Sequence, residues 1–144
     1  MLGLHFHPLR VARIVADTDE ARIVSFTVPA TLKGEFAFRP GQYLTLRRRI
    51  GGEDLRRSYS ICASPDDGEL RVGVRKVPGG RFSSWLHESL REGDTIDALA
   101  PQGRFVVPAE DGRARHLLLA AGGSGITPMI AIARERINAP RGVA

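Results

Sequence analysis

The chain has 144 residues, a mass of 15.7 kDa and a formal net charge of +5 at pH 7. This length suits one domain, or one domain and part of a second, and 42% hydrophobic with 26% charged residues exclude disorder of the whole chain. A single cysteine, Cys62, excludes an internal disulfide framework and a multi-cysteine zinc or iron–sulfur site made by this chain alone. Because residues 1–13 hold no long apolar run, we expect no secretory signal, no membrane span and a cytoplasmic protein.

The positive charge is carried almost entirely by arginine. Of the 21 basic residues only Lys33 and Lys76 are lysines. A GC-rich genome accounts for such a bias, but arginine is also the side chain that pairs best with phosphates and carboxylates. The sequence pI near 10.3 also permits nucleic-acid binding.

The first ~110 residues show closely spaced strand patterns with one helix inserted. A hairpin turn is expected at Gly51-Gly52, and the helix is expected to begin near Ser83 and to end before Gly93. Such spacing is typical of a small β-barrel or sandwich. The strands are expected over residues 10–15, 21–28, 43–49, 57–63, 70–77, 95–99 and 103–107.

The last part of the chain has a different pattern. The continuous apolar run 116–121 predicts a strand buried on both faces, as in a parallel α/β sheet. A glycine-rich loop follows, and then Thr127 as a helix N-cap, Pro128 at the first helical position and an apolar helix over 129–137. This order predicts the opening strand, loop and helix of a nucleotide-binding domain, with a boundary near residues 109–115.

A short strand carries the first candidate motif, Arg57-Ser58-Tyr59-Ser60. Strand alternation places Arg57 and Tyr59 on one face and Ser58 and Ser60 on the other. A planar ligand could then stack on the tyrosine while the arginine holds a phosphate. Read alone, the motif fits an ordinary strand with one packed aromatic residue at least as well.

The second motif joins a strand to a helix through Gly79 and Gly80. Backbone N–H groups at a helix N-terminus bind anions, and Arg75 and Arg81 add positive charge on either side. A capped helix after a tight turn is the equally good structural explanation.

The third motif is the glycine-rich loop at residues 122–128. It lies between an expected strand and an expected helix, as a phosphate-binding loop does. Pro128, however, stands where the dinucleotide-binding fingerprint has its last glycine.

Taken together, the motifs resemble a known family. Arg57-x-Tyr59-Ser60, Gly80-x-x-Ser83 and Gly123-Ser124-Gly125-x-x-Pro128, in this order and spacing, are similar to those of the ferredoxin–NADP⁺ reductase family. The resemblance covers nearly the whole chain. Segments 6–12, 38–42, 55–62, 79–83 and 100–103 look most like the branch of reductase components that serve phenylacetyl-CoA oxygenases (epoxidases).

The resemblance implies a mainly β fold. Residues 1–110 would form a six-stranded antiparallel FAD-binding barrel with one short helix, and residues 115–144 the first βα unit of an incomplete NAD(P)-binding domain. The family's later Cys-Gly-Pro segment and the branch's four-cysteine ferredoxin-like domain have no counterpart here. We therefore expect a fragment of a longer reductase or the product of a truncated gene.

The resemblance also implies a site for FAD, with no metal. Arg57 would pair with the pyrophosphate, Tyr59 would stack on the isoalloxazine ring and Ser60 would hydrogen-bond flavin N5. Tyr59, Ser60 and Thr127 are the implied catalytic residues. The implied cofactor-binding set is Arg57, Ser58, Tyr59, Ser60, Val74, Arg75, Lys76, Gly79, Gly80, Arg81, Phe82, Ser83, Gly123, Ser124, Gly125 and Thr127.

The implied activity is hydride transfer from NAD(P)H to FAD, followed by single-electron transfer to an iron–sulfur domain or an oxygenase component. A non-catalytic flavin-binding fragment is an open alternative. A basic barrel that binds an acidic protein or nucleic acid is less favoured, because only 6% of the residues are aromatic and base stacking needs exposed aromatics. Without its sheet neighbours, the last helix should expose Ile130, Ile132 and Ile137 and favour self-association.

Overall fold

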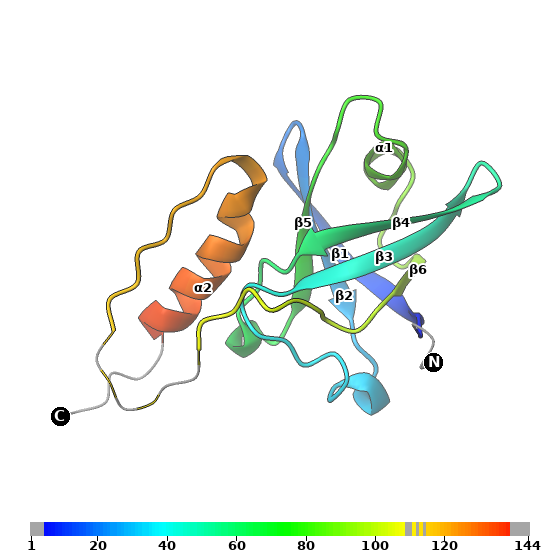
Figure 1. Ribbon diagram of the computed structural model, residues 1–144. Coiled ribbons are helices and arrows are strands. Elements are labelled where there is room, and N and C mark those ends of the chain that lie inside the picture. The colour runs from blue at the N-terminus through cyan, green and yellow to red at the C-terminus, as the bar shows by residue number, and fades with distance from the viewer. Residues whose placement is uncertain (1–4, 109–110, 112, 114, 139–144) are drawn as a thin grey trace.

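The computed structural model describes residues 5–108, 111, 113 and 115–138, and its main body is a six-stranded antiparallel sheet beside which a C-terminal helix lies (Figure 1). The sheet order is β4-β3-β6-β1-β2-β5. The strands are β1 (His7–Thr18), β2 (Ala21–Thr27), β3 (Tyr43–Ile50), β4 (Glu53–Ser60), β5 (Leu70–Arg75) and β6 (Thr95–Ala98). The helices are α1 (Arg81–Glu88) and α2 (Ile126–Asn138), with 3-10 turns η1 (Ala30–Leu32), η2 (Pro65–Asp67) and η3 (Gly123–Gly125).

The sheet closes into a barrel where its two edge strands meet. β4 and β5 are neighbours in the chain but lie at opposite edges of the sheet. Just after β4, Ile61 forms an antiparallel bridge with Val72 of β5, and the Cys62 N–H donates to the Arg71 carbonyl at 3.0 Å. This seam confirms the expected six-stranded antiparallel barrel. Cys62 is half-buried there, and burial raises the pKa of its thiol.

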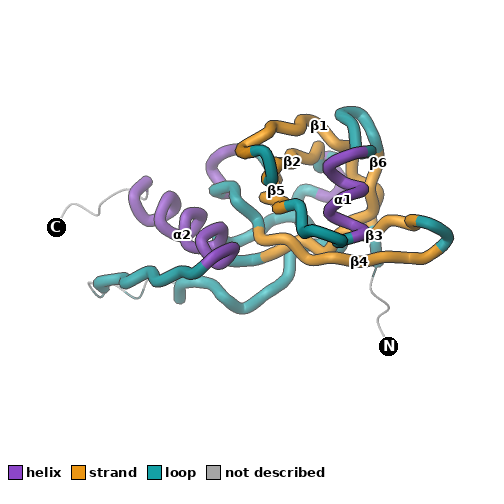
Figure 2. Tube along the Cα trace, turned by 90° about the horizontal axis from the view of Figure 1, so that it is seen from above, coloured by secondary structure: helices purple, strands orange, loops and turns teal. Residues whose placement is uncertain are grey.

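Strand alternation fills the barrel with aliphatic side chains. Leu44, Leu46 and Val72 are fully buried, and each such side chain contributes ~1.5–3 kcal/mol through burial. Helix α1 lies over one end of the barrel, where Phe82 and Leu86 enter the core (Figure 2).

Two turns depend on the conformational freedom of glycine. The β3–β4 hairpin turns at Gly51 and Gly52, with φ of +58° and +84°, as its type requires. Gly41 has a φ of +102°, and a Cβ built there would lie only 1.7 Å from the Phe105 carbonyl oxygen. The segment after Gln102 can therefore pass close to the turn before β3 only because residue 41 has no side chain.

Helix α2 packs against the side of the barrel near this crossing (Figures 1 and 2). Ala131 and Ile132 are buried, and the Ile132 Cδ1 lies 3.5 Å from a Cβ built on Gly41. Arg134 reaches Asp67 of η2 at 4.0 Å. The expectation that Ile132 is exposed was therefore wrong, whereas Ile130 and Ile137 are exposed as expected.

Two predicted strands and one predicted cap are wrong. Residues 103–107 form no strand, and only Gln102 bridges to Tyr43. Residues 116–121 are extended without a pairing strand among the described residues, and Leu118 is 95% exposed. An apolar run becomes a strand only when a neighbour takes up its N–H and carbonyl groups. Helix α2 begins at Ile126, so Thr127 lies inside its first turn and is not the N-cap.

The expected division at residues 109–115 stays a prediction, because residues 109, 110, 112 and 114 lie outside the described part of the chain. Neither described helix has the length and apolar character needed to cross a bilayer.

Candidate functional site

The first predicted motif lies on the edge strand β4. Register with β3 pairs Arg57 with Leu46 and Tyr59 with Leu44, so the arginine and the tyrosine share the face of two core leucines. Ser58 points the other way, and its Oγ lies 2.9 Å from the Thr45 Oγ1. The alternation predicted from the sequence is confirmed.

Tyr59 is half-buried beside helix α1. Its ring centroid lies 6.1 Å from that of Phe82, with the two planes tilted by 38°. Burial raises the pKa of the Tyr59 phenol to about 12, although the nearby positive charge of Arg57 lowers it in part. Tyr59 is therefore a neutral, flat ring held in place from behind by Phe82, as a stacking surface requires. Ser60 follows at the strand end, half-buried and opposite Tyr43.

Arg57 differs from the other basic residues of the site because it has no carboxylate partner in the described chain. Its guanidinium donates to the Arg56 carbonyl, at 2.7 Å. The side chain is exposed, so its remaining N–H groups can donate hydrogen bonds to an anion.

The second motif forms a tight turn that delivers helix α1. The Ser83 Oγ accepts the Val77 N–H at 3.1 Å and lies 3.4 Å from the Gly80 carbonyl. A Cβ built on Gly80 would lie 2.6 Å from that Oγ and 3.0 Å from the Val77 carbonyl oxygen, so a side chain there would force the Ser83 hydroxyl to shift. Ser83 is 6% exposed. Its hydroxyl is therefore committed to the turn that presents the first N–H groups of α1.

Three basic residues around this turn are already paired with carboxylates. Arg81 contacts Glu53 at 2.6 Å and donates to the Ile50 carbonyl at 3.1 Å, which ties the start of α1 to the β3–β4 hairpin. Arg75 pairs with Glu20 at 3.1 Å. Lys76 pairs with Glu88 at 2.9 Å and lowers the pKa of that carboxyl.

Two members of the predicted set offer no side chain to a ligand. Val74 and Phe82 are each 1% exposed and belong to the core. The Val74 carbonyl also accepts the Nε2–H of buried His87, at 3.0 Å, which anchors α1 on β5. A cofactor on this face could reach these two residues only through the backbone.

The third motif lies against β5. Gly123, Ser124 and Gly125 form η3, and the Thr127 Cγ2 that follows lies 3.9 Å from a Cβ built on Gly73. The structure thus brings Thr127, two residues after the glycine loop, to the strand that also carries Val74. All three motifs therefore meet around the β4–β5 side of the barrel.

Sequence reasoning missed several residues of this region. Gly73 interrupts an alternating strand, and such a glycine signals a close approach by another segment, here Thr127. No local pattern pointed to Glu53 as the partner of Arg81, because the two are 28 positions apart.

The arginine-rich face of the β3–β4 hairpin is largely occupied by its own neighbours. Arg47 pairs with Asp97 at 2.8 Å, and its guanidinium lies 4.1 Å from the centre of the Phe6 ring. Arg56 lies 5.2 Å from the same ring and contacts Asp54 at 3.6 Å. These contacts disfavour a nucleic-acid surface there. The described residues hold no cluster of three or more His, Cys, Asp or Glu side chains that could bind a metal ion.

Comparison with known proteins shows which proteins the chain is similar to. The chain is 47% identical over 128 residues to a subunit of the 1,2-phenylacetyl-CoA epoxidase of Escherichia coli K12, covering 88% of this chain and 36% of that protein. It is 37% identical over 129 residues to the glycine betaine monooxygenase reductase subunit of Pseudomonas aeruginosa UCBPP-PA14, covering 89% and 34%. The chain thus spans about a third of the length of these curated relatives.

Solved structures show the same architecture. Phthalate dioxygenase reductase superimposes with a TM-score of 0.74 at 28% identity, covering 94% of this chain and 41% of that one. Residues 8–107 match the family described as the oxidoreductase FAD-binding domain. That match covers more than half of the sequence and spans β1 to β6, so the chain belongs to the FAD-binding domain family of oxidoreductases, with a fold like that of ferredoxin reductases.

Proposed function

We propose that this chain holds FAD across the β4–β5 side of the barrel and forms the flavin module of an NAD(P)H-dependent reductase. The observation that carries the proposal is the position of Arg57, a cation without a carboxylate partner in the described chain. It shares a face with the half-buried ring of Tyr59, which packs on Phe82 at the start of α1. A hydrogen-bond donor for an anion and a flat neutral ring lie on one strand. They suit the pyrophosphate and the isoalloxazine of one ligand.

The chain's own groups fit such a ligand. Arg57 would donate to the pyrophosphate together with the first N–H groups of α1, which have no acceptor within the helix. Ser83 would act by holding the turn, because its hydroxyl bonds within it. Tyr59 would cover one face of the ring and keep water from it, and Ser60 would present its hydroxyl at the strand end. When bound, FAD supplies hydride acceptance and single-electron release.

The glycine loop and Thr127 would complete the donor side of the site. The Thr127 methyl group lies beside Gly73 of β5, which supports a place for it beside the flavin, where the nicotinamide of NAD(P)H would enter. The electrons would then pass to an iron–sulfur domain or an oxygenase component.

The substrate system is the finer part of the proposal. An oxygenase acting on phenylacetyl-CoA is supported by the name of the relative at 47% identity. The chain spans only about a third of the length of these relatives, so complete turnover is proposed for the whole reductase and flavin binding for this part of it. A cytoplasmic location, where NAD(P)H is supplied, is part of the same proposal.

Two neighbouring arginines provide the test. FAD binding is measured by flavin fluorescence and visible absorption for the wild type, Arg57→Met and Arg56→Met. Arg57→Met should weaken FAD binding by about 10- to 100-fold, because hydrogen bonds to charged groups contribute ~1.5–3 kcal/mol. Arg56→Met removes the same charge from beside Phe6 and should leave the affinity within about twofold. Equal losses in both variants, or no FAD binding by the folded wild type, would overturn the proposal.

A further inference from the structure

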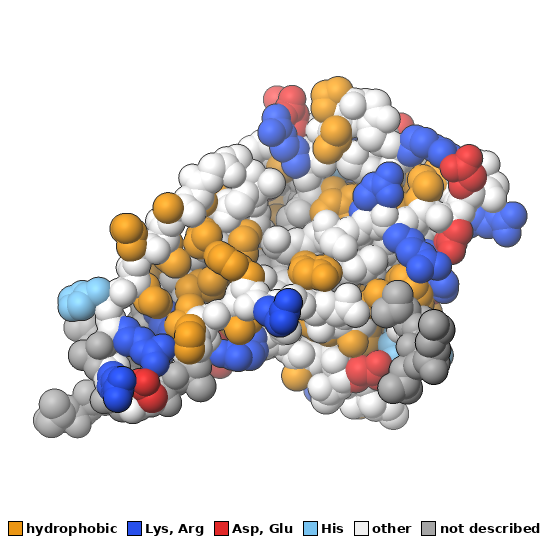
Figure 3. All heavy atoms as spheres, in the orientation of Figure 1, with side chains coloured by type: hydrophobic (Ala, Val, Ile, Leu, Met, Phe, Trp, Pro, Cys, Tyr) orange, Lys and Arg blue, Asp and Glu red, His pale blue; other side chains and the backbone are white. Residues whose placement is uncertain are grey.

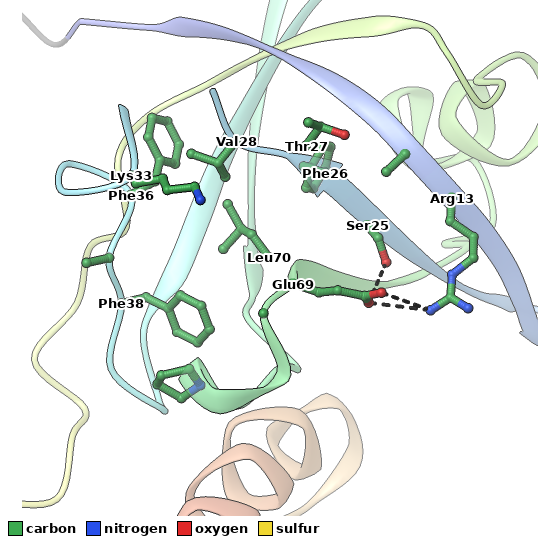
Figure 4. Close-up of a pocket in the computed structure, with 14 residues that line it drawn as sticks. Arg13, Ser25, Phe26, Thr27, Val28, Lys33, Phe36, Phe38, Glu69 and Leu70 are labelled. Carbon is green, nitrogen blue, oxygen red and sulfur yellow. Dashed lines mark hydrogen bonds and ion pairs between the residues drawn. The ribbon is translucent and has the colours of Figure 1, made fainter. Parts of the chain in front are cut away.

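A cavity of about 810 Å³ opens at the end of the barrel opposite α1. Its lining comes from β1 and β2, the segment 28–38 that follows β2, and the residues from η2 to the start of β5 (Figure 4). The volume lies in the range of small-molecule sites, ~300–1,000 Å³, and the mouths of barrels are common places for them. None of the residues assigned to FAD above lines this cavity.

The cavity has an apolar floor. Phe26, Phe36 and Leu70 line it and are each at most 4% exposed, so their visible edges face the cavity. Phe38 and Val28 are half-buried and form its walls. Figure 4 shows side chains from separate segments turned toward one shared space. Such a lining suits an aromatic or branched aliphatic group.

The charged side chains that line the cavity carry an excess of positive charge. Its carboxylate, Glu69, already contacts Arg13 at 3.4 Å, Arg71 at 3.1 Å and the Ser25 hydroxyl at 3.4 Å. The Lys33 ammonium has no ionic or hydrogen-bonding partner among the described side chains, and in Figure 4 it lies beside Val28. The surplus charge at the mouth is therefore positive.

We propose that this cavity binds a small amphipathic carboxylate, with its apolar body on Phe36, Phe38 and Leu70 and its carboxylate on Lys33. A cationic ligand would meet Lys33 and find Glu69 already paired. A neutral ligand would gain the apolar contacts but not the ion pair. This site is independent of the flavin site, and its test does not require FAD.

The test compares two ligands that differ in charge. The ¹⁵N-labelled chain is titrated with 4-phenylbutyrate and with 4-phenylbutanol while its ¹H–¹⁵N spectrum is recorded. The carboxylate should shift amides within residues 25–38 and 65–70 and bind several-fold more tightly than the alcohol. Shifts confined to the exposed apolar residues of α2 and the segment before it, or equal affinities of the two ligands, would overturn the proposal.

The two lysines of the chain provide matched variants. Lys33→Met should weaken 4-phenylbutyrate binding by about fivefold and leave 4-phenylbutanol binding unchanged, as expected for one partly exposed ion pair. Lys76 lies outside the cavity, so Lys76→Met should change the affinity for neither 4-phenylbutyrate nor 4-phenylbutanol. Ala37→Trp, which fills the cavity from its exposed rim, should abolish binding of both ligands. Full affinity for 4-phenylbutyrate in Lys33→Met would refute the assignment of Lys33.

Discussion

Arg81, the first residue of helix α1, contacts Glu53 at 2.6 Å and so joins the helix to the first residue of β4. The same guanidinium donates to the Ile50 carbonyl on the other side of the hairpin turn. One side chain thus sets the distance between the strand that carries Tyr59 and the turn that carries Gly80. The resemblance implies that Arg81 binds the cofactor. From its contacts we predict that it acts instead by positioning the helix.

Arg81→Met should weaken FAD binding by about three- to tenfold with a small change in stability. Both side chains are about half exposed or more, so the ion pair itself contributes only ~0.2–1 kcal/mol to folding. The exchanged pair Arg81→Glu with Glu53→Arg should restore part of the affinity. FAD titration and urea unfolding measure the two effects. Arg115→Met, which breaks another exposed pair, serves as the control. A ligand role for Arg81 predicts no rescue by the exchange.

Gly80→Ala should destabilise the chain by ~1–3 kcal/mol, because the new methyl group would lie 2.6 Å from the Ser83 Oγ. Ser83→Ala should cost ~1–2 kcal/mol through the loss of the acceptor for the Val77 N–H. In the double variant the clash with the hydroxyl is absent, so the two losses should be less than additive. Urea unfolding of the four proteins completes the cycle. Full additivity would show that the two residues are not coupled.

The raised pKa of Tyr59 predicts an alkaline loss of stability. In the unfolded chain the phenol loses its proton near pH 10, whereas in the folded chain it keeps it until about pH 12. The folded state therefore binds more protons between these values, and stability falls as the pH rises from about 10 to 12, by at most ~2 kcal/mol. Tyr59→Phe should flatten this part of the stability profile. The same substitution should remove the phenolate step near pH 12 from an absorbance titration at 295 nm.

The exposed apolar side chains near the C-terminal end predict self-association of this chain. They gather over α2 and the segment before it, at the left of Figure 3. Leu118 is 95% exposed and Ile137 78%, and patches of this kind are unusual on monomers. Sedimentation velocity should show concentration-dependent dimers or larger species, and Leu118→Glu with Ile137→Glu should shift them toward monomer. A wild type that stays monomeric at high concentration would contradict this prediction.

The barrel was predictable from sequence because its signals are local. Alternation in β3 and β5, the Gly51-Gly52 turn and the helical spacing of Phe82 and Leu86 each report their own surroundings. The prediction of a strand at residues 116–121 was wrong. Its apolar pattern indicates a strand that needs neighbouring strands on both sides, and the described part of the chain provides none.

The site was predictable as three motifs but not in its internal contacts. Which basic residue remains unpaired depends on partners far along the chain, such as Glu53 for Arg81 and Glu20 for Arg75. The sequence alone treats these arginines and Arg57 alike, and only the folded arrangement separates them. The cavity near Lys33 was missed for the same reason, since its walls come from separate segments.

Hydrogen exchange at the seam between β4 and β5 should report whether the barrel is closed. In the part of the chain that the structure describes, the backbone pairing of these edges is short: it consists of the Ile61–Val72 bridge and the Cys62 N–H bond to the Arg71 carbonyl. Most other strand pairs share longer ladders. Opening of the ring should therefore begin there, and the Cys62 amide should exchange with solvent sooner than amides inside the sheet. A ligand that spans both edges binds the closed barrel preferentially. Saturating FAD should therefore slow exchange of the Cys62 amide, by a factor set by the ratio of the FAD concentration to its Kd.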